Sequence, residues 1–174
     1  MMSLQLFLQS RTSKQEIEDM VNHVSKSPSE IPHLITGMQS GDYRANQQAG
    51  WVIGKLGELA PELLTPYTGE LLELLEMPKI DGVHRNIWRA TQFMTIPEEH
   101  KGRMLDVGFT HFEDRSAKVA IRMFALKTIT PLVEEHPELM EEIRAIIEYS
   151  WEGSTAGFKS ITGNTLKKWD RKYS

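Results

Sequence analysis

Residues 41–64 read GDYRANQQAGWVIGKLGELAPELL, and they decide the fold class of the chain. Apolar residues recur here every three or four positions, which places them on one face of a helix over 42–60. The residues of that face are Ala45, Ala49, Val52, Ile53, Leu56, Leu59 and Ala60. Pro61 ends this helix, because proline has no N–H to donate, and a Leu-rich segment follows it. The stretch therefore predicts two helices joined at Pro61.

The same helical spacing recurs along the rest of the chain, and Pro, Gly and Ser residues separate the segments. Helices are expected over 13–26, 27–40, 62–76, 83–94, 96–112, 116–132, 137–151 and 155–172, in addition to 42–60. Pro66 and Gly69 weaken the first half of 62–76, so an alternative start of its regular part is Pro66, with Thr65 as the cap. Only residues 107–111 alternate as a strand would, and they fit a helix equally well. We therefore predict an all-α fold of about nine helices.

The composition is that of a soluble globular protein and excludes several kinds of site. The 174 residues include 20 Lys and Arg, 24 Asp and Glu and no Cys, and the formal net charge is −4. Without Cys, a disulfide scaffold, a thiolate metal site and a cysteine nucleophile are excluded. The longest apolar run covers about four residues, at 123–126, so no membrane-spanning helix is expected. The N-terminus lacks a signal-peptide pattern, and a cytoplasmic location is expected.

Segments of the chain resemble one another at regular intervals. Residues 60–63 (APEL) correspond to residues 136–139 (HPEL) at a shift of 76. Between them, Ala49 corresponds to Ala90 at a shift of 41, and Ala90 corresponds to Ala125 at a shift of 35. Two-helix units at this interval are typical of stacked hairpins, since one pair of helices cannot bury both of its apolar faces.

In this pattern the chain resembles the family of HEAT-like repeats. The repeat of that family carries an Asp followed closely by an Arg, then an Ala, a Leu-rich segment and a Pro-Glu pair. Residues 41–64 contain the best copy. The second copy keeps Asp81 and Arg85 but has no Pro-Glu pair. The third copy keeps Ala125 and the Pro-Glu pair but has Ala120 in place of the Arg.

The resemblance covers about residues 30–152 and implies a short right-handed α-solenoid of HEAT-like helical hairpins. It implies a single domain over 1–174. The N-terminal tail is expected either to dock on the first hairpin or to be disordered. The expected parts are the N-terminal tail (1–11), a capping hairpin (12–41), about three repeats (42–152) and a basic C-terminal capping helix (153–174).

Two further features of the sequence agree with stacking. Helix 116–132 is apolar on two nearly opposite faces, one with Ile121 and Phe124 and the other with Met123 and Leu126. A helix of this kind is enclosed between neighbours rather than exposed at the edge of a bundle. The tryptophans Trp51 and Trp88 lie off the apolar stripes of their own helices, and we expect them to pack on the adjacent repeat.

No motif in the sequence points to catalysis, a metal or a cofactor. Residues 50–55 resemble a phosphate-binding loop, but one residue is missing between the glycines and Leu56 replaces the required hydroxyl. The small residues there are better explained by close helix packing. The histidines are scattered, and the Glu-Glu-His triplets at 98–100 and 134–136 do not form a metal-binding helix face. A non-enzymatic function, with no cofactor and no metal, is therefore favoured over an enzymatic one.

The candidate interaction surface consists of Arg and Trp residues at or near equivalent repeat positions, together with nearby basic residues. Its members are Arg44, Trp51, Lys55, Arg85, Trp88, Arg89 and Arg122. A candidate basic tail in the last helix contains Lys159, Lys167, Lys168, Arg171 and Lys172. Arg and Trp dominate binding energy in many protein interfaces, so a protein-interaction or scaffold module with an unidentified protein partner is the preferred hypothesis.

Two alternatives remain open at this point. A basic ladder with aromatic residues also suits nucleic acid, and the chain is similar in this respect to the solenoids of DNA alkylation repair glycosylases. That hypothesis requires the basic residues to converge on one face. The same residues also suit a structural role, because the repeat Arg of HEAT-like folds pairs with an Asp of a neighbouring repeat, here Asp42 or Asp81.

Overall fold

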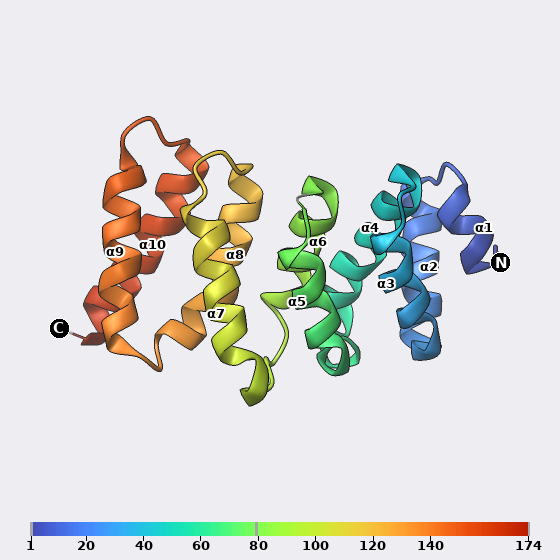
Figure 1. Cartoon of the computed structure of the whole chain (residues 1–174), viewed down its shortest axis with the longest axis horizontal. Coiled ribbons are helices and arrows are strands. Elements are labelled where there is room, and N and C mark those ends of the chain that lie inside the picture. The colour runs from blue at the N-terminus through green and yellow to red at the C-terminus, as the bar shows by residue number, and fades with distance from the viewer. Residues whose placement is uncertain (1, 79, 174) are drawn as a thin grey trace.

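The chain forms an elongated stack of helices whose two ends lie far apart (Figure 1). The computed structural model describes residues 2–78 and 80–173, and in these ranges all regular structure is helical. The ten α-helices of this part are α1 (Leu4–Gln9), α2 (Lys14–Lys26), α3 (Ile31–Gln39), α4 (Tyr43–Leu59), α5 (Thr68–Glu76), α6 (Asp81–Thr91), α7 (Glu98–Glu113), α8 (Val119–Val133), α9 (Pro137–Trp151) and α10 (Ala156–Tyr173). Short 3₁₀ helices are present at Pro28–Glu30, Pro61–Leu63 and Thr65–Tyr67.

The helices are arranged in two layers along the long axis. Helices α2, α4, α6 and α8 contact one another in succession, and α3, α5 and α7 do the same beside them. Contacts between α3 and α4, between α5 and α6, and between α7 and α8 join the two layers. The predicted all-α solenoid is therefore confirmed. None of the helices in the described ranges has the length and hydrophobicity that crossing a membrane requires.

The structure differs from the predicted helices at three places. The expected N-terminal tail contains α1, which buries Leu4 and Phe7 and raises the helix number above the predicted nine. Residues 61–67 form two 3₁₀ turns instead of the start of a long helix, because Pro61 and Pro66 interrupt the backbone hydrogen-bond ladder. Helix α8 begins at Val119, after a turn in which the Asp114 carboxylate accepts the backbone N–H of Ser116 at 2.8 Å.

Glycine residues allow α4 and α6 to approach very closely. A Cβ atom at Gly54 would lie 2.8 Å from Oδ1 of Asn86, and one at Gly57 would collide with the backbone of Ala90. The contact between these two helices is the most extensive between any two elements of the described chain. The glycines of residues 50–55 thus serve helix packing, as the sequence analysis proposed.

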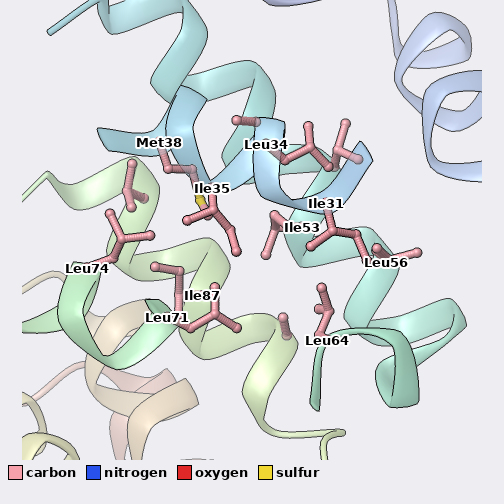
Figure 2. Packing of buried hydrophobic residues seen from close by; sticks show 14 of the residues in the cluster. Ile31, Leu34, Ile35, Met38, Ile53, Leu56, Leu64, Leu71, Leu74 and Ile87 are labelled. Carbon is pink, nitrogen blue, oxygen red and sulfur yellow. The ribbon is translucent and has the colours of Figure 1, made fainter. Parts of the chain in front are cut away.

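Buried aliphatic side chains form a seam along the two layers. Figure 2 shows part of this seam, in which side chains of α3, α4, α5 and α6 gather between the helices, among them Ile35 of α3, Ile53 of α4, Leu71 of α5 and Ile87 of α6. This first cluster extends from α1 to α8, and a second cluster joins α7, α8, α9 and α10.

The two clusters adjoin at α7 and α8. Leu105 packs against both of them. Trp51 and Phe124 are half-buried and pack against the first cluster.

Candidate interaction surface

The first residues of α4, α6 and α8 surround one groove of about 580 Å³. These three helices follow one another along the solenoid (Figure 1), so the groove crosses three successive two-helix units. We call it the three-helix groove. Its wall includes Tyr43, Gln47, Ile80, Asp81, Arg85, Lys118 and Val119.

Local capping positions the α4 side of the groove. The Asp42 carboxylate accepts the backbone N–H groups of Arg44 at 2.7 Å and Ala45 at 3.1 Å, and so starts α4 at Tyr43. Asp42 therefore caps its own helix, and no ion pair joins it to an Arg of another repeat in the described ranges. One turn later, Gln47 lies over the start of α6, where a Cβ atom at Gly82 would collide with its amide.

Apolar side chains are unusually exposed around the groove. Tyr43 is 74% exposed, Val119 38% and Ile80 36%. Each comes from a different helix or helix cap. Exposed apolar side chains that gather at one place are typical of a binding surface, whereas single ones are ordinary.

Charges in the groove are only partly paired. Lys118 Nζ lies 3.5 Å from the Asp81 carboxylate. Arg85 is exposed, and it makes no ion pair or side-chain hydrogen bond with the residues that the structure describes. The groove therefore carries one guanidinium in excess of its described ion pair.

Arg44 and Arg85 occupy equivalent repeat positions but differ in their surroundings. The Arg44 guanidinium donates from Nη1 to the backbone carbonyl of Gln9 at 3.1 Å, at the end of α1. The neighbouring Gln48 amide donates to the carbonyl of Ser10 at 2.7 Å. The N-terminal segment thus engages Arg44, while Arg85 faces the groove.

Several other predicted site residues connect neighbouring repeats. Lys55 of α4 lies 3.7 Å from the Glu18 carboxylate of α2, and Arg89 of α6 donates to Glu58 of α4 at 2.6 Å. These pairs join successive helices of one layer. They match the structural alternative of the sequence analysis, although the acidic partners are not the predicted aspartates.

Trp88 is a correction to the predicted interaction surface, because its side chain is fully buried. Its indole N–H donates to Nδ1 of His111 at 2.8 Å, and the His111 ring stacks on that of His84 at a centroid distance of 5.1 Å. The indole therefore packs α6 against α7 and is not available to a partner.

Arg122 is a second correction, since only 7% of the residue is exposed. It donates from Nε to the carbonyl of Phe112 at 2.8 Å and from Nη2 to Ser150 at 3.0 Å, and its guanidinium lies 4.6 Å from the Phe158 ring centre. Burial, together with Arg115, lowers the pKa of Arg122, and Asp114 opposes this effect. The buried Arg122 side chain of α8 therefore contacts α7, α9 and α10.

The predicted basic tail is largely bound to the protein itself. The Glu134 carboxylate accepts hydrogen bonds from Lys168 at 2.7 Å, Lys172 at 2.9 Å and the Trp169 indole at 3.0 Å. Partial burial raises the pKa of Glu134, but these three donors outweigh it and lower the pKa to about 2. Lys159 lies 5.5 Å from the Trp151 ring centre, whereas Lys167 and Arg171 are exposed.

The structure thus does not bring the residues of the predicted interaction surface to one place, whereas four residues of the predicted basic tail line one open pocket of about 510 Å³ together with Asn164: Lys167, Lys168, Arg171 and Lys172. Of the predicted set, only Arg85 lines the three-helix groove. The sequence pattern did not single out four other residues that line the groove: Tyr43, Gln47, Ile80 and Val119. One signal for Tyr43 was available, because it directly follows the Asp cap of the best repeat copy.

No group of three or more His, Asp or Glu residues within the described ranges is arranged to hold a metal ion.

Comparison with known proteins identifies the repeat. A family model described as the HEAT repeat domain matches residues 4–169 of the chain. Neither the curated proteins nor the solved structures that were compared provide a match. The similarity to DNA alkylation repair solenoids is therefore not shown. The match spans nearly the whole chain and agrees with its two-layered stack of helices, so the chain belongs to the HEAT repeat domain family.

Proposed function

We propose that this HEAT repeat domain is a non-enzymatic interaction module that binds a partner protein in the three-helix groove. HEAT repeats form helical scaffolds that commonly mediate protein interactions. One observation carries the assignment to this groove. Exposed apolar side chains from three successive units gather there around an exposed guanidinium.

The charge arrangement supports a protein partner over nucleic acid. Lys55, Arg89 and Lys118 form ion pairs with neighbouring helices, and Lys168 and Lys172 are bound to Glu134. Nucleic-acid binding relies on many cations that are free to contact phosphates. The net charge of −4 also opposes general binding of a polyanion.

Affinity capture from the source cells tests the proposal with a matched pair of variants. Tyr43→Ala removes the most exposed ring of the groove. Tyr149→Ala is the control, because Tyr149 is 73% exposed and belongs to α9, away from the groove. We expect a protein that the wild type and Tyr149→Ala retain and that Tyr43→Ala loses. Equal retention by all three proteins would place the interaction elsewhere.

Binding to a labelled DNA duplex provides the second arm. A nucleic-acid-binding protein would bind the duplex with an affinity that falls steeply with salt, and charge reversal at the exposed Lys167 and Arg171 would weaken it. We expect no such binding at physiological salt. Salt-sensitive binding that depends on these two residues would overturn the proposal in favour of nucleic acid.

A further inference from the structure

The excess charge of the three-helix groove indicates the chemistry of its partner. Asp81 and Lys118 lie 3.5 Å apart and largely compensate one another, so the exposed Arg85 dominates the field inside the groove. A guanidinium presents several N–H donors in a planar fork, and a carboxylate accepts two of them at once. Charge complementarity therefore favours an acidic side chain opposite Arg85.

Gln47 adds a site for a peptide backbone. Its side-chain amide forms no hydrogen bond with the described residues, although it lies over Gly82 at the wall of the groove. A primary amide offers a donor and an acceptor next to each other. The backbone of an extended peptide presents a carbonyl and an N–H in the same way.

The apolar side chains supply the third element. Tyr43 lies at the α4 side of the groove, and Val119 at the α8 side, so they are separated by α6. Packed helix axes lie about 8–10 Å apart, so the groove spans about 20 Å from α4 to α8. An extended peptide covers this distance with about six residues at about 3.3 Å each.

We propose that the three-helix groove binds an extended acidic segment of a partner protein, about six residues long. An Asp or Glu of this segment pairs with Arg85, its backbone bonds the Gln47 amide, and its apolar side chains cover Tyr43 and Val119. This inference rests on the proposed function and specifies the partner for the same site. A single exposed guanidinium with apolar neighbours suits a carboxylate peptide better than a polyphosphate, which needs several free cations.

Selection from a displayed library of random eight-residue peptides tests this specificity. The bait is the full chain as wild type, as Arg85→Gln and as Arg171→Gln, the last being an exposed arginine of α10 away from the groove. We expect the wild type and Arg171→Gln to enrich peptides that combine Asp or Glu with apolar residues. With Arg85→Gln, the enrichment of Asp and Glu should disappear.

An enriched peptide is then made with a fluorescent label and titrated against each protein. Loss of a charge-assisted hydrogen bond predicts at least a roughly tenfold weaker Kd for Arg85→Gln than for the wild type. Replacing the acidic residue of the peptide by its amide should weaken binding to the wild type but not to Arg85→Gln. Circular dichroism spectra must match among the proteins, so that unfolding does not explain the loss.

The outcomes separate this inference from the proposed function. Any of three results would overturn the acidic specificity. The first is that the enriched peptides carry no excess of Asp and Glu. The others are that the excess survives in Arg85→Gln and that no peptide is enriched at all. The proposed function would survive the first of these results if Tyr43→Ala still abolished binding. It would fail if the partner captured from cells bound Tyr43→Ala as strongly as the wild type.

Discussion

Glu134 holds the last helix of the chain, so neutralising this carboxylate should loosen α10. Glu134 lies in the turn between α8 and α9 and accepts hydrogen bonds from Lys168, Trp169 and Lys172 of α10. Its side chain is only 13% exposed. Either the substitution Glu134→Gln or protonation at low pH removes the charge that these donors stabilise.

The size of the effect follows from the pKa of Glu134. Partial burial raises this pKa, but the hydrogen bonds from Lys168, Lys172 and Trp169 outweigh burial and lower the pKa from 4.5 to about 2. At about 1.4 kcal/mol per pH unit, the difference corresponds to about 3 kcal/mol of folding free energy. The side chains of Lys168 and Lys172 are more than half exposed, and solvent screening reduces the expected value to about 2 kcal/mol.

The sign of the pH dependence is fixed by the direction of the shift. Because the folded-state pKa is lower than the unfolded one, the stabilisation is complete above about pH 4.5 and is lost as the pH falls towards 2. We expect the wild type to exceed Glu134→Gln by about 2 kcal/mol at pH 7. The two proteins should become equally stable near pH 2.

Two measurements test these expectations. Urea unfolding followed by circular dichroism compares the proteins from pH 7 to pH 2.5, and hydrogen exchange at pH 7 reports the local opening of α10. A loss of about 2 kcal/mol makes exchange in α10 roughly 30-fold faster. Glu135→Gln is the control, since Glu135 bonds Lys101 of α7 instead of α10.

Unchanged protection of α10 in Glu134→Gln would refute the reasoning. A stability difference that stays constant between pH 7 and pH 2.5 would do the same, because it would show that the charge of the carboxylate is irrelevant.

Three other substitutions give contrasting expectations, each measured as the free energy of urea unfolding. Gly57→Ala should cost about 1–3 kcal/mol because its Cβ would collide with the α6 backbone, whereas Gly41→Ala meets open space and should change stability far less. Arg122→Ala should cost about 3–5 kcal/mol because it empties a buried, hydrogen-bonded site, whereas the exposed Arg85→Ala should stay within about 0.5 kcal/mol. Asp42→Ala removes the N-cap of α4 and should cost about 1 kcal/mol, and an unchanged stability would contradict the capping role.

The fold was predictable because local sequence patterns indicate most of its helices. Apolar stripes and Pro or Ser start signals gave every helix from α2 to α10, and the ends agree within a few residues except at the start of α5, which lies at Thr68 instead of 62. Helix α1 was missed because six residues are too few to be stable alone, and it is stabilised by docking, as the buried Phe7 shows. The break at 61–67 was predicted only in part, because Pro66 was expected to weaken the start of this helix, whereas two 3₁₀ turns at Pro61–Leu63 and Thr65–Tyr67 precede α5.

The site was less predictable because exposure depends on neighbours that a helical wheel does not contain. Arg44 and Arg85 are equivalent in the repeat, yet α1 engages only the first of them. Arg122 is the instructive failure. It shares the apolar face of Val119 and Leu126, and the two-sided pattern of that helix already indicated that an arginine there is enclosed.

The division of the hydrophobic seam at Leu105 has a consequence for how the molecule comes apart. Ile121, a buried side chain of α8 that lines the three-helix groove, belongs to the cluster that extends from α1 to α8. Helices α9 and α10 are stabilised mainly by the other cluster and by Glu134. Detachment of the C-terminal pair would therefore leave the α4 and α6 walls of the groove in place and would remove packing partners from its α8 wall, because Met123, Leu126 and Ile129 of α8 belong to the second cluster. A change in α6 would act on the groove directly, whereas a change in α10 would reach it only through α8.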